Sequence, residues 1–377
     1  MGKIKRVRAR WVPVAAVGAA VAAAVGGAVW AHGGIGFGIG TGSGSAAAAS
    51  GALTSSSLRH GHAAEHGVNQ TATALPSLAL QAPLVPTAQR SFTGEGEWRA
   101  LAADSHGQPV VQGTMLRAGG SSVPVAIAWI RQAAARFELH PGYAQPGGTW
   151  SQPDMLPRES RSGLLATWNG GFLMGDSGGG FFLDGKQYGP LVPGVAAEVF
   201  HRDGSFTVGV WGRDVKMDPT VVGVRQQRQL MIDGGRIAGN IDSLNTWGIT
   251  DGGATYVRRS GVGVTAGGDV VFALGPVMSP RSLATALQQA GAVRAMELDI
   301  NISWPSFMAY DSSVDPLDPR PFKWGDYPRP AERYFSHSAR DFVAVYSRTA
   351  VSHGGCVDAT GAARPQPGRS TGAPLAC

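Results

Sequence analysis

Two short polar segments stand where apolar runs end or begin, and their residue types suit anion chemistry. Asn169, Gly170 and Gly171 follow one apolar run; glycines let a backbone approach a ligand closely, and the asparagine both donates and accepts. Arg258 and Arg259 open another run, where a guanidinium can bind two oxygens of a phosphate or carboxylate. Plainer interpretations stay open, since Asn-Gly-Gly is a common turn and a strand-end arginine is often a surface ion pair.

A third segment carries two carboxylates near the end of an apolar run. Glu297 and Asp299 are two residues apart in a predicted strand, so they share one face while Leu298 points to the other. Burying a charge costs free energy, so carboxylates in such a run indicate a function. Carboxylate pairs act at glycosidic bonds, although a shared face does not fix their separation. Asp176 and Asp251, each in a Gly-rich loop, are held in reserve as further candidates.

The elements that must position these segments are short. Apolar runs alternate with Gly and Asp-Gly turns across residues 91–350, a pattern typical of strands joined by tight turns. The turn at Asp203-Gly204 and the one at Asp233-Gly234 predict hairpins. Strands are predicted at 123–130, 136–139, 164–168, 196–200, 205–211, 261–264, 269–274, 293–298 and 341–346. The run 230–237 is predicted to be a hairpin of two strands.

One helix is well marked between the predicted strands. Ser279 suits the N-cap, Pro280 the first helical position and Gly291 the stop, with apolar residues at helical spacing between them. A strand follows at once, so helix and strand are expected to pack together. These elements predict an α+β fold, a curved and mostly antiparallel sheet with a few packed helices, preceded by one N-terminal transmembrane helix or signal segment.

The basic charge of the chain is concentrated at its N-terminus. The net charge is +6, but five of the 32 Lys and Arg residues lie in the first ten positions, leaving 27 against 26 Asp and Glu. A nucleic-acid-binding protein needs a basic patch on its folded part, so no nucleic-acid partner is predicted. No motif in the sequence requires a cofactor or metal, and a divalent cation is an open alternative that no residue pattern supports.

Residues 11–30 carry no charge, and twenty helical residues span about 30 Å, the thickness of a bilayer core. With the basic residues 1–10 on the cytoplasmic side, this predicts a single-pass protein of the cell membrane whose domain lies outside the cytoplasm, or a secreted protein if the chain is cut near Ala31. A buried core helix is the alternative interpretation. Residues 31–90, rich in Gly, Ala and Ser with four His, are predicted to be a flexible linker.

Both cysteines lie in the Gly- and Pro-rich tail, residues 351–377. In an exported protein such a pair predicts a disulfide, here between Cys356 and Cys377. Their spacing matches no zinc site.

The order and spacing of four segments resemble the phosphodiester glycosidase family. The segments are TWNGGFL (167–173), RRSGVGVTAGGDVVFA (258–273), SPRSLATALQQAGA (279–292) and AMELDINISW (295–304), within a resemblance over residues 120–346. The resemblance implies hydrolysis of a sugar-1-phosphodiester in a phosphorylated glycan or cell-envelope polymer. Where the family reads LDGGGS, this chain reads LDINIS, so the loop forms either a different substrate pocket or a site without turnover. The second possibility gives the alternative function, a non-catalytic glycan- or envelope-binding module.

The resemblance also implies roles for individual residues. Arg259 would hold the phosphodiester anion, and Asp299 would act as base or nucleophile at the anomeric carbon with Glu297 as its partner. The remaining implied contacts to phosphate or sugar come from Asn169, Gly170, Gly171, Asn301 and Ser303.

Overall fold

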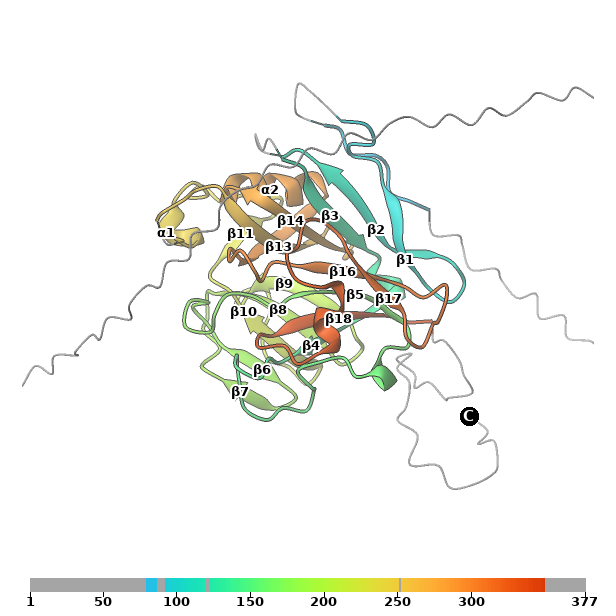
Figure 1. Cartoon of the computed structure of the whole chain (residues 1–377). Helices are drawn as coiled ribbons and strands as arrows, with labels where there is room; N and C mark the ends of the chain where they lie inside the picture. Colours follow the sequence, from blue (N-terminus) through green and yellow to red (C-terminus); the bar gives the residue numbers. More distant parts are fainter. Residues whose placement is uncertain (1–78, 87–91, 119–122, 251, 350–377) are drawn as a thin grey trace, which may run out of the picture. The chain divides into compact units, whose positions relative to one another are not determined.

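The computed structural model describes residues 79–86, 92–118, 123–250 and 252–349. Within these ranges the chain is mostly β, with three antiparallel sheets and two α-helices (Figure 1). The prediction of an α+β fold was therefore wrong. Segments with no clear alternation, such as Val221–Gln226 and Phe307–Asp311, also pair as strands, and one of the two α-helices has only four residues.

The largest sheet has eight strands. In spatial order they are β1 (Arg99–Ala103), β2 (Pro109–Leu116), β3 (Val125–Ile130), β14 (Val270–Met278), β13 (Val257–Thr265), β15 (Ala292–Asp299), β11 (Leu230–Asp233) and β12 (Arg236–Ile237). β11 and β12 form the hairpin expected around Asp233-Gly234. β13 pairs with both β14 and β15, which places Ser260 opposite Asp299.

Two five-stranded sheets complete the fold. One has the order β7 (Lys186–Tyr188), β6 (Phe181–Leu183), β10 (Val221–Gln226), β8 (Ala196–His201) and β9 (Phe206–Val210). The other has the order β17 (Arg320–Lys323), β16 (Phe307–Asp311), β5 (Leu164–Asn169), β18 (Phe342–Ser347) and β4 (Ala135–His140). The β8–β9 pairing confirms the hairpin predicted at Asp203-Gly204. The 3₁₀ helices are η1 (Gln132–Ala134), η2 (Arg158–Ser160) and η3 (Ala331–Phe335).

Helix α2 (Pro280–Gln289) confirms the predicted helix and covers one face of the large sheet (Figure 1). The Ser279 hydroxyl accepts from the N–H of Ser282 at 3.1 Å, which caps the helix, and Gly291 follows its end with φ +92°. The second α-helix is α1 (Leu244–Trp247). Leu283 and Leu287 of α2 pack with Val271 of β14, so this face of the sheet is buried.

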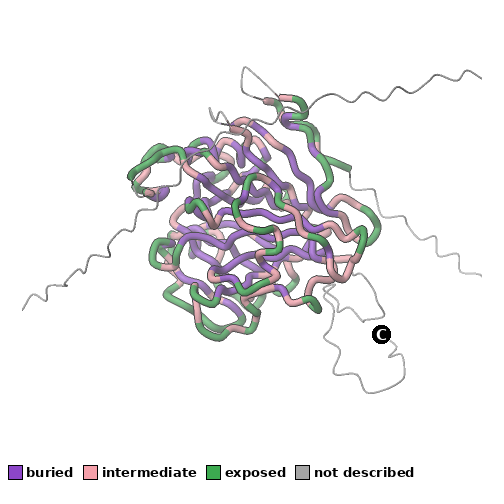
Figure 2. The backbone as a smooth tube through the Cα atoms, in the orientation of Figure 1, coloured by how far each residue is buried: buried purple, intermediate pink, exposed green. Residues whose placement is uncertain are grey.

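The opposite face of the large sheet packs against the other two sheets. Phe272 of β14 contacts Trp168 of β5, whose ring also meets Phe137 of β4, Phe206 of β9 and Phe307 of β16. Strands from all three sheets therefore share one core, which appears as the buried interior of Figure 2. Rings of this size contribute much of the apolar area that holds such sheets together. The site's strands are fixed relative to one another by this core.

Some predictions concern residues that the structure does not describe. The expected membrane segment 11–30 and the expected disulfide between Cys356 and Cys377 both lie outside the described residues. Among residues 79–86, 92–118, 123–250 and 252–349, no helix combines the length and the apolar character needed to cross a bilayer.

Candidate functional site

The ends of several strands meet around one pocket of about 850 Å³. β15 ends there at Asp299, β13 begins there at Val257, and the segment after β5 contributes Phe172. We call it the strand-end pocket. Its lining residues are Phe172, Leu173, Asp176, Arg228, Gly248, Ile249, Thr250, Val257, Arg258, Pro276, Asp299, Ile300, Asn301, Ile302 and Arg340.

Asp299 is the carboxylate that β15 brings to the pocket wall. It is only 3% exposed, and its Oδ1 accepts from the backbone N–H groups of Ile300 at 2.7 Å and Asn301 at 2.9 Å. Its Oδ2 lies 3.0 Å from Nη1 of Arg340 and accepts no hydrogen bond from the described residues. Burial raises the pKa of Asp299, while the Arg340 charge opposes this rise. The backbone therefore fixes Oδ1, and Arg340 faces Oδ2.

Arg340 joins the two loops that flank Asp299. Its Nη2 donates to the backbone oxygen of Gly171 at 2.5 Å, and its guanidinium lies 5.0 Å from the centre of the Trp304 ring. Sequence reasoning missed this residue. The only signal was a charged pair, Arg340 and Asp341, directly before an apolar run.

Two further arginines line the strand-end pocket. Arg258, at the start of β13, pairs through Nη2 with Oδ2 of Asp326 at 2.8 Å. Arg228 follows β10 with the left-handed φ of +38° and lies 4.6 Å from the centre of the Phe172 ring. Its Nη1 donates to the backbone oxygen of Thr246 at 3.2 Å. Packing and hydrogen bonds thus hold both guanidinium groups at the pocket.

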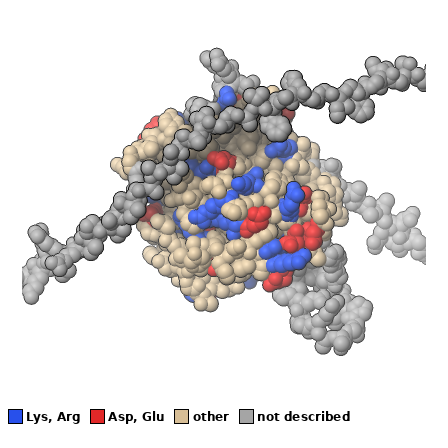
Figure 3. Space-filling view, in the orientation of Figure 1, with Lys and Arg blue, Asp and Glu red and all other residues tan. Residues whose placement is uncertain are grey.

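Positive charge exceeds negative charge in the pocket wall. Arg228, Arg258 and Arg340 face two lining carboxylates, Asp299 and the exposed Asp176. Basic and acidic side chains are likewise interspersed on the face of the molecule that Figure 3 shows. Arg340 is paired with Asp299 and Arg258 with Asp326, so Arg228 is the lining arginine without a carboxylate partner among the described residues. A guanidinium of this kind in a concave site attracts anions.

Arg259 and Glu297 lie behind the pocket wall and form a buried ion pair. Arg259 is fully buried, and its Nη1 donates to Oε1 of Glu297 at 2.6 Å. Backbone oxygens of Met278, Trp247 and Thr255 accept the other donated bonds of the guanidinium. Burial raises the pKa of Glu297 to about 7 against the opposing Arg259 charge. Neither residue lines the pocket, so their expected contacts with substrate stay predictions.

Asn169, the last residue of β5, is buried beside the pocket. Its Oδ1 accepts from the hydroxyl of Ser260 at 3.1 Å and from the N–H of Ser306 at 3.0 Å. Its Nδ2 has no hydrogen-bond partner among the described residues. The side chain therefore ties β5 to β13 and to the segment before β16.

The two glycines after Asn169 are required by packing. A Cβ on Gly170 would lie 2.0 Å from Oδ2 of Asp341, and one on Gly171 would lie 1.3 Å from Nε2 of Gln227. The N–H of Gly170 donates to the backbone oxygen of Asp341 at 2.9 Å, and Gln227 bonds the backbone oxygen of Gly170 and the N–H of Phe172. The turn is thus rigid, and the amide of Gly170 already has a partner.

A buried charge cluster supports this turn from behind. Nε of Arg225 in β10 donates to Oδ2 of Asp341 at 2.7 Å, and Arg225 also donates to the backbone oxygen of Phe172. Glu198 of β8 stands opposite Arg225 in the sheet. Burial raises the pKa of Glu198 well above its usual range. The Arg225 guanidinium therefore pairs with Asp341 behind the turn.

The remaining sequence candidates fall in loops. Asn301 lines the pocket, and its Oδ1 accepts from the N–H of Ser303 at 2.9 Å, which closes a small turn after β15. Asp251 lies outside the described residues. Within the part of the chain that the structure describes, no group of three or more His, Cys, Asp or Glu is arranged to hold a metal ion.

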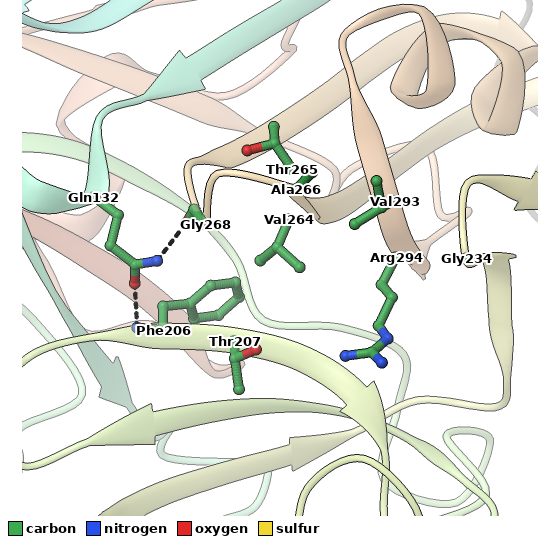
Figure 4. Close-up of a pocket in the computed structure, with 10 residues that line it drawn as sticks. All are labelled: Gln132, Phe206, Thr207, Gly234, Val264, Thr265, Ala266, Gly268, Val293 and Arg294. Atoms are coloured by element: carbon green, nitrogen blue, oxygen red, sulfur yellow. Dashed lines mark hydrogen bonds between the residues drawn. The ribbon is translucent and has the colours of Figure 1, made fainter.

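A second cavity, of about 350 Å³, lies between the β13–β14 turn and β9 (Figure 4). Its polar side chains are engaged within the protein: Gln132 donates to Gly268 and accepts from the N–H of Phe206, and Arg294 pairs with Asp214. The strand-end pocket, which is lined by a buried carboxylate and three arginines, is the better candidate site.

Comparisons with known proteins give a distant likeness in fold. No family model and no curated protein matches the chain. Among solved structures it is similar to the catalytic domain of zebrafish N-acetylglucosamine-1-phosphodiester alpha-N-acetylglucosaminidase, at 17% identity and a TM-score of 0.42, over 66% of this chain and 87% of that one. It is also similar to a hypothetical protein from Synechocystis (13%, TM-score 0.35, 64% and 62%) and to a protein from Burkholderia pseudomallei (11%, TM-score 0.35, 61% and 76%).

Proposed function

We propose that the strand-end pocket hydrolyses a sugar-1-phosphodiester. The observation that carries the proposal is Asp299, a buried carboxylate with a raised pKa, in a wall whose other charged residues are three arginines and Asp176. Glycoside hydrolysis requires carboxyl groups beside the anomeric carbon, and a phosphodiester leaving group requires fixed positive charge. The pocket contains both kinds of group.

In this proposal the arginines bind the phosphate and Asp299 acts on the sugar. Arg340 contacts the Asp299 carboxylate, so a phosphate bound to its guanidinium would lie next to the reacting carbon. Oδ2 of Asp299 either attacks that carbon or takes a proton from the attacking water, since Oδ1 is held by two backbone N–H groups. The bond from the anomeric carbon to the phosphate oxygen breaks, water supplies the new hydroxyl of the sugar, and a phosphomonoester leaves.

The Arg259–Glu297 pair supports the site from behind in this scheme. Glu297 lies two residues before Asp299 in β15, and Arg259 lies in β13. Their ion pair therefore fixes β15 against β13. We therefore assign anion binding to Arg228, Arg258 and Arg340 in place of Arg259.

The test is release of free sugar from a panel of sugar-1-phosphodiesters, N-acetylglucosamine first. The wild type is expected to release sugar from at least one, and Asp299→Asn to lose this activity while still unfolding in one cooperative thermal transition; its melting temperature is expected to fall, because buried Arg340 loses its carboxylate partner. Asp242→Asn is the matched control, because this exposed carboxylate pairs only with surface Arg281. No release from any substrate by the folded wild type contradicts the proposal.

A binding module on the same fold is the second candidate. The backbone bonds to Oδ1 and the ion pair to Arg340 also suit an Asp299 that only holds its loop in shape. A binder would retain affinity for the phosphodiester in both wild type and Asp299→Asn, with no sugar released from either. Calorimetric titration beside the release assay separates the two functions.

A further inference from the structure

The mouth of the strand-end pocket carries three exposed aliphatic side chains. Leu173 is 41% exposed, Ile249 is 59% exposed and Ile302 is 73% exposed, and all three line the pocket. Exposed aliphatic side chains that line one concave site offer apolar contact area to whatever enters it.

These three residues come from three separate segments. Leu173 follows the turn after β5, Ile249 follows α1, and Ile302 lies in the loop after β15. The two smaller cavities are the one of about 350 Å³ described above and one of about 240 Å³ beside Arg136 and His201. No exposed large apolar residue in the described ranges lines either of them. The apolar residues thus converge on the pocket that also holds Asp299 and the three arginines.

The pocket is therefore amphipathic, with charged groups in its wall and aliphatic groups at its mouth. Phe172, Ile300 and Pro276 continue the apolar lining between them. A ligand that matches both parts carries a phosphate and, attached to it, an apolar chain. A phosphodiester has two ester arms, so the sugar can enter while the other arm follows the mouth.

We propose that the substrate is a sugar joined through phosphate to a long-chain apolar alcohol. The inference rests on the proposed hydrolysis and names the second ester arm. Water attacks the anomeric carbon, the bond from that carbon to the phosphate oxygen breaks, and the products are the free sugar and the alkyl phosphomonoester. The alcohol keeps its ester bond to phosphorus, and its chain lies against Leu173, Ile249 and Ile302.

The experiment compares methyl and octyl esters of the sugar phosphate that the panel identifies, both below the micelle concentration of the octyl ester. The full chain is expected to show a kcat/KM at least about tenfold higher for the octyl ester than for the methyl ester. Burial of fewer than two methylene groups of the octyl chain supplies the free energy for this difference. The double variant Ile249→Ser/Ile302→Ser is expected to bring the octyl-to-methyl ratio close to one. Val314→Ser is the matched control, since Val314 is 89% exposed and lines none of the three cavities, and it should keep the wild-type ratio.

The outcomes separate this inference from the proposed function. Hydrolysis of both esters at equal kcat/KM overturns the inference and leaves the hydrolase, as does an octyl preference that survives in the double variant. A third outcome is an octyl-to-methyl ratio of one in solution, together with faster hydrolysis of substrate embedded in phosphatidylglycerol vesicles. The apolar residues would then contact a bilayer, and this outcome also overturns the inference. Hydrolysis of no ester refutes both.

Discussion

Arg259→Met tests whether Arg259 is a structural cation rather than a ligand for the anion. The substitution keeps an apolar stem of similar length and removes every donor of the guanidinium. It leaves the Glu297 carboxylate, which has no other hydrogen-bond partner among the described residues, in a buried site. Backbone oxygens of Met278, Trp247 and Thr255 lose their donor as well. The variant should therefore be strongly destabilised.

The size of the effect follows from the burial of the pair. Removing one partner of a buried ion pair costs about 3–5 kcal/mol. The pKa of Glu297 is raised to about 7 even with Arg259 present, and loss of the cation raises it further. The folded variant then holds a proton that the unfolded chain releases, so the cost grows above pH 7 by up to about 1.4 kcal/mol per pH unit.

Urea unfolding of wild type and variant at pH 7 and pH 8.5 measures both parts of this prediction. Arg259→Met/Glu297→Leu, which leaves neither charge, should recover at least about half of the lost free energy of unfolding. A single variant that costs less than about 1 kcal/mol at both pH values would refute the reasoning. Such a result would reopen the role that the family resemblance implies for Arg259, binding of the phosphodiester anion.

Three further outcomes are expected. Gly171→Ala should cost at least about 2 kcal/mol in urea unfolding, because its Cβ would lie 1.3 Å from buried Nε2 of Gln227; wild-type stability would contradict this packing. Because the pKa of Glu297 is raised in the folded state, Glu297 stabilises the fold below pH 4.5, and this contribution is lost as the pH rises through 7. Glu297→Gln should therefore reduce the fall of the urea midpoint between pH 4.5 and pH 7. A fall as steep as that of the wild type would count against this prediction. Arg340→Met should shift the acidic limb of the pH–rate profile upward, because Arg340 lowers the pKa of Asp299, and a downward shift would exclude that pairing.

Local signals in the sequence predicted individual elements well. Ser279, Pro280 and Gly291 bracket α2, and Asp203-Gly204 marks the β8–β9 hairpin, because caps and tight turns depend on residues close in the chain. β10 was missed because buried Arg225 and Gln226 interrupt its apolar pattern. The number of sheets, and hence the fold class, depends on long-range strand pairing that no local pattern specifies.

The site shows the same division between local and long-range information. Asp299 was predicted because a carboxylate ending an apolar strand is conspicuous within a few residues. Arg340 was missed because its contact with Gly171 spans 169 positions of the chain. Gly170 and Gly171 were singled out as contacts for substrate, which stays a prediction, and the sequence does not show that Asp341 and Gln227 fill the space beside them.

The most direct test of the central claim is the kcat of Asp299→Asn on the sugar-1-phosphodiester that the wild type hydrolyses. The account predicts a fall of at least about 10²-fold, with binding of the phosphodiester and a cooperative urea transition retained. A variant that turns over at the wild-type rate would contradict the assignment of Asp299 to the chemistry and, with it, the strand-end pocket as the active site.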